Sequence, residues 1–186
     1  LIFFEAAKGL HPKYNQFGSE NRVIDLLIEP YNFILSAASS FYKRENIVHN
    51  SFDISLIAEE DTLFNFNLYS KFSKIGYVCE NKVCYHYRRR KVANSQVNLN
   101  TINPKAYYMP IELLEKVTIP KDSELYYELV IYELRSRIKS IKQDFFETKA
   151  EYDKLLISYG NYIKRVPIDF IVKKTKFLDL ESKILY

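Results

Sequence analysis

The sequence predicts an α/β fold that passes into a mostly helical C-terminal part. In roughly the first hundred residues, short apolar runs alternate with turn-forming residues, as strands and short helices do. Beyond about residue 104, apolar residues recur at helical spacing over much longer stretches. No internal repeat or low-complexity segment is visible. We therefore predict two parts, a mixed α/β part over residues 1–103 and a helical extension over residues 104–186.

The first predicted strand covers residues 22–27 (Arg-Val-Ile-Asp-Leu-Leu). Pro30 ends it, because proline has no N–H to give to a sheet. The remaining expectations before residue 54 are an apolar run over 1–7, a polar loop over 11–21, a strand or turn over 33–42, a short helix near 44–48 and a turn over 50–53.

A helix is predicted from about residue 60 to residue 73, because apolar residues fall on one broad face and Gly76 follows to stop it. After it we expect two short strands, at 77–78 and 83–87, around a turn at 80–82. A polar loop over 88–104 comes next, and loops of that length are often functional. The residues that define the apolar face are Leu63, Phe64, Phe66, Leu68 and Phe72.

The C-terminal part is predicted to be three helices and a tail. The expected helices cover 105–117, 120–146 and 147–159, and Gly160 ends the third. Asp122 and Ser123 are candidates for the N-cap of the long helix, where a side-chain oxygen accepts from a free backbone N–H. Its aromatic residues Tyr126, Tyr127 and Tyr132 are predicted to pack against neighbouring helices rather than to form a ligand platform. Val166-Pro167 marks a further break before residues 168–186.

The composition is that of a packed globular protein, with 47% apolar and 16% aromatic residues. The net charge of +4 permits an anionic ligand without demanding nucleic acid. Cys79 and Cys84 suit neither a zinc site nor a disulfide framework, so reduced cysteines in the cytoplasm are expected. No run approaches the roughly 18 apolar residues of a membrane span. Because the chain starts at Leu1, we expect a fragment of a longer protein.

Two charged clusters carry the candidate chemistry. Glu59, Glu60 and Asp61 stand where the helix begins, and free N–H groups there keep a carboxylate ionised. Arg88, Arg89 and Arg90 follow a Tyr-x-Tyr pair, and guanidinium groups match phosphate oxygens. Each cluster also has a simpler interpretation: a favourable helix N-terminus for the acids, and a solvated basic face for the arginines.

In order and spacing, these motifs resemble the second half of a family 2 glycosyltransferase of the GT-A type. The resemblance rests on Phe52-Asp53, on Glu60-Asp61-Thr62-Leu63-Phe64, on Tyr85-His86-Tyr87-Arg88-Arg89-Arg90 and on Asn94-Ser95. Residues 23–26 and 36–43 are similar to the acceptor-side segment of bacterial enzymes that make capsule and teichoic acid. The likeness covers residues 20 to about 140. It implies a mostly parallel sheet whose first strands come from a missing N-terminal half.

The resemblance implies an inverting transfer of a sugar from a nucleotide-sugar to an acceptor hydroxyl in bacterial surface polysaccharide synthesis. Asp61 would be the general base, and Glu60 would orient it or contact the acceptor. Arg88, Arg90 and Ser95 would hold the diphosphate leaving group. Ser39, Ser40 and Tyr87 would contact a glycan or lipid-linked acceptor. For the serines, structural hydrogen bonding is the alternative.

Two departures from the family pattern limit what these residues do alone. The nucleotide-binding half with its Asp-x-Asp metal motif is absent, so the fragment is expected to be inactive by itself. Arg90 stands where many relatives have a metal-binding His, and strand alternation points His86 away from Tyr85 and Tyr87. A divalent metal, Mg²⁺ or Mn²⁺, is therefore expected to be bound mainly by the missing half.

Two rival functions remain open at this stage. One is a non-catalytic helical module that docks a partner enzyme or the membrane surface. Lys173, Lys174 and Lys176 allow a peripheral contact with an anionic membrane. The other is a nucleic-acid-binding domain built on the arginine run, which the mild net charge and the nearby acids disfavour, so no nucleic acid is expected. The expected location is the cytoplasm, at the inner face of the plasma membrane.

Overall fold

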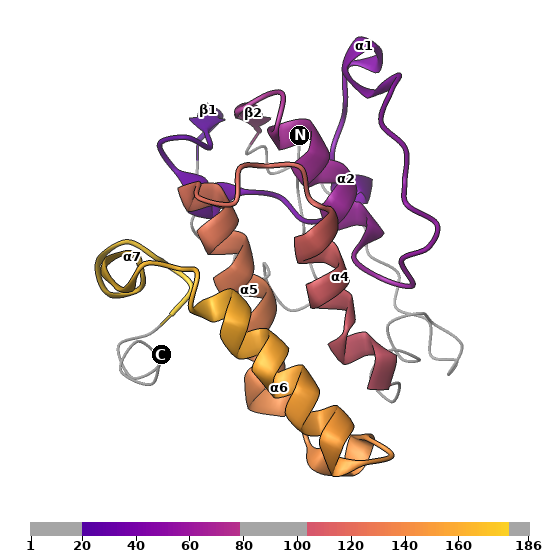
Figure 1. The fold of residues 1–186 in the computed structure, drawn as a ribbon. Helices are drawn as coiled ribbons and strands as arrows, with labels where there is room; N and C mark the ends of the chain where they lie inside the picture. Colours follow the sequence, from indigo (N-terminus) through magenta and orange to yellow (C-terminus); the bar gives the residue numbers. More distant parts are fainter. Residues whose placement is uncertain (1–19, 79–103, 179–186) are drawn as a thin grey trace.

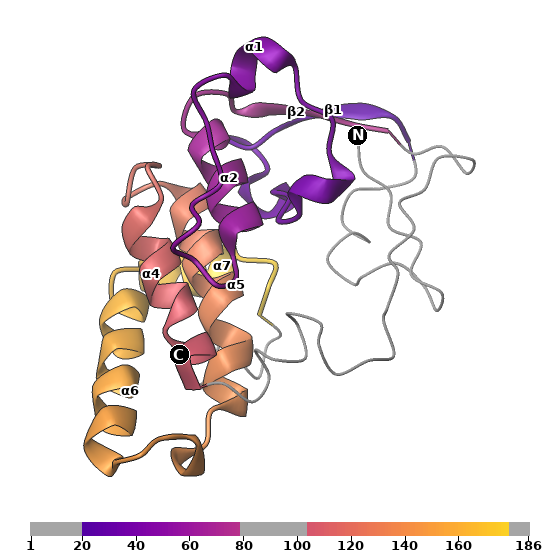
Figure 2. The same ribbon diagram turned by 90° about the vertical axis from the view of Figure 1, so that its right-hand side faces the viewer.

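A computed structural model of the chain describes residues 20–78 and 104–178 (Figure 1). In this part, a pair of strands and two helices from the first half of the chain lie above a group of longer helices (Figures 1 and 2). The fold is therefore mixed α/β with a small sheet and a large helical share. The elements of the first half are β1 (Arg22–Asp25), the 3-10 turns η2 (Pro30–Asn32) and η3 (Ala37–Ser39), α1 (Arg44–Ile47), α2 (Glu60–Tyr69) and β2 (Lys74–Tyr77). Those of the second half are η4 (Pro104–Tyr107), α4 (Met109–Lys116), α5 (Glu124–Ser140), η5 (Gln143–Phe145), α6 (Lys149–Ile163) and α7 (Ile168–Lys173).

The two described strands pair antiparallel, with Arg22 opposite Tyr77 and Ile24 opposite Ile75. These two strands therefore do not form the mostly parallel sheet that the resemblance led us to expect. Alternation along β1 buries Ile24 completely and leaves Val23 68% exposed. One side of the pair therefore packs on the core.

One hydrophobic cluster joins both halves of the described chain. It includes Ile24 and Phe66 from the first half and Leu113, Leu129 and Leu134 from α4 and α5. Helix α5 also packs against α6, which returns alongside it after η5 (Figure 2). The predicted division at residue 103 falls in 79–103, outside the described residues, and stays a prediction.

Two glycines do not act as predicted. Gly76 lies within β2, and α2 has already ended at Tyr69. Gly160 lies inside α6, which continues to Ile163 because the packing of Tyr159 and Tyr162 in the core outweighs one glycine's low helix propensity. Glycine permits a helix to end but does not require it.

The long helix predicted over 120–146 is shorter, because α5 covers Glu124–Ser140 and the separate turn η5 follows it at Gln143–Phe145. Ser123 is the N-cap of α5 and accepts from the Tyr126 N–H at 3.2 Å. The expected helix over 105–117 is divided into η4 and α4, and Pro110 lies in the first turn of α4, where proline is well tolerated. Tyr126 is completely buried, as predicted for a packing residue. The predicted strand at 83–87 and loop at 88–104 lie almost entirely outside the described residues, which resume at Pro104. No helix in the described ranges is long and apolar enough to cross a bilayer.

Candidate active site at the start of helix α2

Asp61 lies half-buried in the first turn of α2, as the sequence predicted. Its carboxylate accepts hydrogen bonds from the backbone N–H of Ala37 and from the side chain of Ser36. Burial raises the pKa of Asp61, and the nearby Glu59 charge adds to the rise, while the two hydrogen bonds oppose it. A carboxylate with a raised pKa is a stronger base than an exposed one.

Asp61 begins a polar stripe on α2 that holds the chain segment 34–37. Asn65 and Tyr69 follow at intervals of four residues, so the three side chains share one helix face. The Asn65 amide donates to the carbonyls of Ile34 (3.2 Å) and Leu35 (3.0 Å). The Tyr69 hydroxyl donates to the Ile34 carbonyl and accepts from its N–H, each at 3.1 Å. The stripe therefore satisfies backbone groups that no sheet or helix satisfies.

Glu59 fixes the start of α2 from the other side. It is the N-cap residue and adopts the left-handed conformation (φ 70°), which is uncommon for a residue with a side chain. Its carboxylate forms an ion pair with Arg137 of α5 at 2.5 Å and accepts from the Thr62 hydroxyl at 3.2 Å. Arg137 also pairs with Glu133, whose side chain is 1% exposed. The C-terminal helices thus help to hold the segment that carries Asp61.

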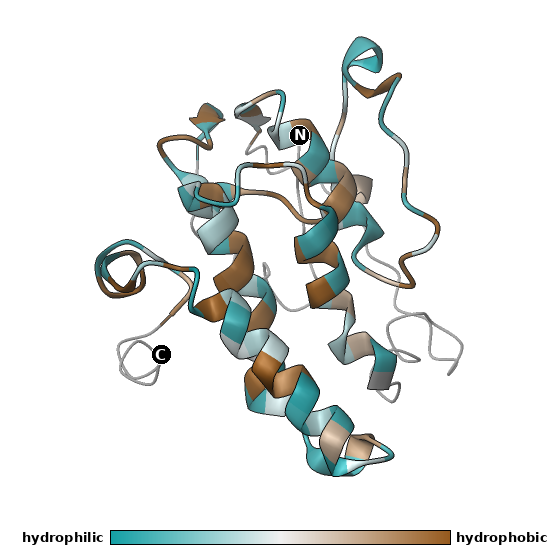
Figure 3. Cartoon of the chain, viewed as in Figure 1, coloured by the Kyte–Doolittle hydropathy of each residue, from teal (hydrophilic) through white to brown (hydrophobic). Residues whose placement is uncertain are grey.

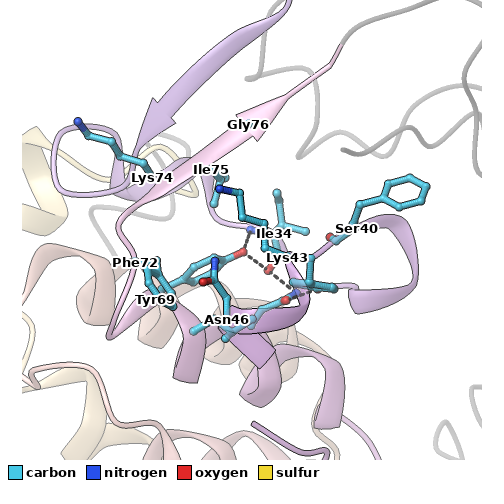
Figure 4. Close-up of a pocket in the computed structure, with 13 residues that line it drawn as sticks. Ile34, Ser40, Lys43, Asn46, Tyr69, Phe72, Lys74, Ile75 and Gly76 are labelled. Carbon is cyan, nitrogen blue, oxygen red and sulfur yellow. Dashed lines mark hydrogen bonds between the residues drawn. The ribbon is translucent and has the colours of Figure 1, made fainter. Parts of the chain in front are cut away.

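A cavity of about 270 Å³ lies beside the stripe, between α2, β2 and the segment 40–46 (Figure 4). Tyr42 joins the cavity to the polar stripe, because its hydroxyl donates to the Asn65 side chain at 2.5 Å. Burial raises the pKa of Tyr42, and the Asp61 charge contributes to the rise. Asp61 itself does not line the cavity. Its lining residues are Ile34, Ser40, Phe41, Tyr42, Lys43, Asn46, Asn65, Leu68, Tyr69, Phe72, Lys74, Ile75 and Gly76.

The structure brings some of the predicted site residues together. Glu60 is half-buried beside Asp61 in the first turn of α2. Ser40 lines the cavity, whereas Ser39 is buried and donates to the Ser36 carbonyl at 3.1 Å. Ser40 also donates to the Ser36 carbonyl, at 3.3 Å, and contact of either serine with an acceptor stays a prediction. The other predicted residues, Tyr87, Arg88, Arg90 and Ser95, lie outside the described residues and their roles stay predictions.

Sequence reasoning missed the buried charges of α5. Glu128 and Glu133 are each 1% exposed, and the Thr175 hydroxyl donates to Glu128 at 2.7 Å. Glu133 pairs with Arg137 only four residues on, but Thr175, the partner of Glu128, is 47 residues away, and Glu59, the second partner of Arg137, is 78 residues away. No local pattern in the sequence carries that information. Asn65 was also missed, because it occupies a core position on a helix that otherwise looks apolar.

A divalent metal would need a convergent set of hard oxygen or nitrogen donors. Within 20–78 and 104–178, no three or more His, Cys, Asp or Glu side chains converge in this way. Asp53, in the Phe-Asp pair, is instead bound to Lys116 at 2.7 Å. The divalent metal expected for the complete enzyme stays a prediction.

Comparison with known proteins gives two relatives of this chain. It is 30% identical over 182 residues, 96% of its length, to the minor teichoic acid biosynthesis protein GgaA of Bacillus subtilis (strain 168). It is 26% identical over 184 residues, 93% of its length, to the minor teichoic acid biosynthesis protein GgaB of the same organism. The chain spans 40% of the length of GgaA and 20% of that of GgaB. No family model matches the chain, and no solved structure matches it significantly.

Proposed function

We propose that this chain supplies the catalytic base and the acceptor side of a glycosyltransferase that builds a cell-wall polymer of the teichoic-acid type. The observation that carries the proposal is the similarity to GgaA over 96% of the chain. The position of Asp61, half-buried at the start of α2 with a raised pKa, supports it. The proposed location is the cytoplasmic side of the membrane. Binding of the nucleotide part of the donor is proposed to involve residues outside this chain.

The proposed reaction is an inverting transfer from a nucleotide-sugar. Asp61 takes the proton of the acceptor hydroxyl while the oxygen of that hydroxyl attacks the anomeric carbon of the donor sugar. The bond from that carbon to the diphosphate breaks, and the nucleoside diphosphate leaves with the bonding electrons. Arg88, Arg90 and Ser95 are proposed to hold the leaving diphosphate, where added positive charge favours the transition state. A divalent metal would help to neutralise the same diphosphate.

The interactions of Asp61 with its neighbours support this role. Ser36 and the Ala37 N–H orient the carboxylate, and they favour its ionised form against the effect of burial. Glu60 stands next to it in the same turn, where we propose that it contacts the acceptor. The base is therefore oriented before the acceptor arrives, which lowers the cost of reaching the transition state.

The test is sugar transfer by the full-length protein with a panel of nucleotide-sugars, wild type beside Asp61→Asn. A general base contributes about 10²- to 10⁴-fold, so turnover should fall at least about a hundredfold at an unchanged melting temperature. Asp169→Asn is the control, because that carboxylate is 79% exposed on α7. The wild-type rate should rise with pH through a pKa above that of an ordinary aspartate.

Two outcomes would contradict the proposal. Equal turnover in wild type and Asp61→Asn would leave the acidic pair as a helix N-terminus that binds Ser36 and Ala37. Absence of transfer with every donor would instead favour a non-catalytic module that docks a partner enzyme.

A further inference from the structure

Asn65 is a carboxamide in the interior of the protein. It lies on α2, a helix that carries hydrophilic and hydrophobic residues side by side (Figure 3), and it is only 1% exposed. Burying an amide is costly unless its donor end and its acceptor end both find partners. Asn65 finds these partners in a separate part of the chain, residues 34–42. It therefore joins α2 to that segment.

Tyr42 determines how the Asn65 amide is oriented. The Tyr42 hydroxyl donates to Oδ1 of Asn65 at 2.5 Å, so the amide nitrogen points the other way. That nitrogen donates to the carbonyl oxygens of Ile34 at 3.2 Å and of Leu35 at 3.0 Å. An amide has one acceptor end and one donor end, and here each end meets a matching group. The orientation of the Asn65 side chain is therefore fixed.

The residues that Asn65 holds come directly before those that bind Asp61. Leu35 is followed by Ser36, whose side chain binds the Asp61 carboxylate, and by Ala37, whose backbone N–H does the same. A shift of the backbone at Leu35 would therefore move both groups relative to the carboxylate. Asn65 can thus affect Asp61 through the chain segment between them.

Tyr69 holds the same segment one turn further along α2. Its hydroxyl donates to the Ile34 carbonyl and accepts from the Ile34 N–H, each at 3.1 Å (Figure 4). In the described structure, residues 34–36 belong to no helix or strand. Side chains of α2 therefore satisfy backbone groups that a neighbouring strand would satisfy in a sheet. The position of this segment depends on those side chains.

We propose that Asn65 is a positioning residue for Asp61, and that Tyr42 assists it by fixing its amide. Asn65 holds the backbone that presents Ser36 and Ala37 to the carboxylate, and these two groups keep the carboxylate in one orientation. A base that is oriented in advance loses less freedom when the acceptor hydroxyl arrives. The proposal rests on the proposed function, in which Asp61 is the base.

Loss of this support should change the pKa of Asp61 in a definite direction. The hydrogen bonds from Ser36 and Ala37 lower that pKa, whereas burial and the Glu59 charge raise it. If the segment 34–37 moves away, the lowering effect weakens and the pKa rises further. The other titratable groups around this turn of α2 are Glu60, Tyr42 and Arg137, the last through its pair with Glu59.

The first experiment measures sugar transfer by the full-length protein as a function of pH, in wild type, Asn65→Ala and Tyr42→Phe. Asn65→Ala should lower kcat about tenfold, less than the hundredfold or greater loss expected on removing the base, with KM nearly unchanged. The acidic limb of the pH–rate profile should move up by about half a pH unit. Tyr42→Phe, which removes one hydroxyl and keeps the ring, should shift the limb in the same direction by a smaller amount.

Asn67→Ala is the matched control. Asn67 lies on the same helix, but its Oδ1 accepts from the N–H and the hydroxyl of Thr118, at 3.3 Å and 3.1 Å, instead of bonding to residues 34–37. Its replacement should lower the melting temperature through lost hydrogen bonds and leave the pH–rate profile where it is in wild type. A purely structural role of Asn65 would give the same result as this control.

The second experiment measures the pKa of Asp61 without substrate, from the carboxyl carbon signal in NMR spectra of protein labelled with ¹³C at aspartate. The signal is assigned by its loss in Asp61→Asn. Asn65→Ala and Tyr42→Phe should both raise the pKa above the wild-type value, and Asn67→Ala should not. An unchanged pKa in Asn65→Ala and Tyr42→Phe would overturn the proposal, and if Asn65→Ala does not fold, Tyr42→Phe decides the question alone.

The failure of this proposal and that of the proposed function are distinguishable. If Asp61→Asn transferred sugar normally while Asn65→Ala still raised the pKa of Asp61, the proposed function would fail and the link from Asn65 to the carboxylate would stand. If Asp61→Asn lost transfer but the Asn65 and Tyr42 variants kept the wild-type pKa and pH–rate profile, the positioning role alone would fail.

Discussion

Replacing Arg137 with alanine should destabilise the chain strongly, because this guanidinium serves two carboxylates in a partly closed environment. It pairs with Glu59 at 2.5 Å and with Glu133 at 3.1 Å. The side chains of Arg137 and Glu59 are 23% and 20% exposed, and that of Glu133 only 1%. Burial alone would lower the pKa of Arg137, but the charges of Glu133 and Glu59 raise it overall.

The magnitude follows from the burial of Glu133. Removing one partner of a buried ion pair costs about 3 to 5 kcal/mol, because the remaining charge stays in a poorly solvated site. An exposed pair costs about 0 to 1 kcal/mol. Glu59 lies between these limits, so Arg137→Ala should lower the free energy of unfolding by about 3 to 5 kcal/mol. That loss is a large part of the total free energy of unfolding of a typical domain.

The assay is urea unfolding at pH 7, followed by circular dichroism at 222 nm. Lys173→Ala is the matched control, because its pair with Asp169 is 70% and 79% exposed and should contribute less than about 1 kcal/mol. Arg137→Lys should recover part of the loss, since it restores the charge but not the two-sided geometry. A loss below about 1 kcal/mol in Arg137→Ala would refute the reasoning and show that Glu133 is well solvated.

Two further predictions concern single sites. Hydrogen bonds from Lys116 and Ser55 lower the pKa of Asp53 to about 2, below its ordinary value of 3.8. The stabilisation of the fold by ionised Asp53 is therefore present above about pH 4 and is lost as the pH falls towards 2. The difference in unfolding free energy between wild type and Lys116→Met should follow that course, and a difference that stays constant down to pH 2 would argue against the pair. Gly160→Ala should raise the stability by about 0.5 to 1 kcal/mol, because Gly160 lies inside α6 and an added Cβ meets nothing within 4 Å. A lower urea midpoint would show that a clash outweighs the helix propensity.

Local signals in the sequence predicted the elements that local chemistry determines. The acids at 59–61 mark the start of α2, and Ser123 marks the start of α5. Both depend on a side chain and the backbone N–H groups a few residues further on, so both are visible in a short window. The predictions that Gly76 and Gly160 end helices were wrong, because packing against distant residues determines where these helices end.

The candidate site was predicted only at its centre. Asp61 could be singled out by its neighbours in the sequence, but its partners Ser36 and Ala37 come from a separate segment that joins it only in the fold. The cavity was not foreseen either, because its lining is drawn from the segment 40–46, from α2 and from β2. Their spacing in the sequence indicates that Asn65 and Tyr69 share one face of α2. It does not indicate which groups they bind.

The ion pair between Glu59 and Arg137 has a consequence for the order in which the chain folds. It joins residues 78 positions apart, so the start of α2 is secured only after α5 has docked. Contacts between residues so far apart in the sequence form late, because a large loop must lose conformational entropy before the contact can stabilise the chain. During synthesis from the N-terminus, residues 20–78 would therefore wait for the C-terminal helices to emerge. The C-terminal helices are therefore needed to complete the fold of the first half.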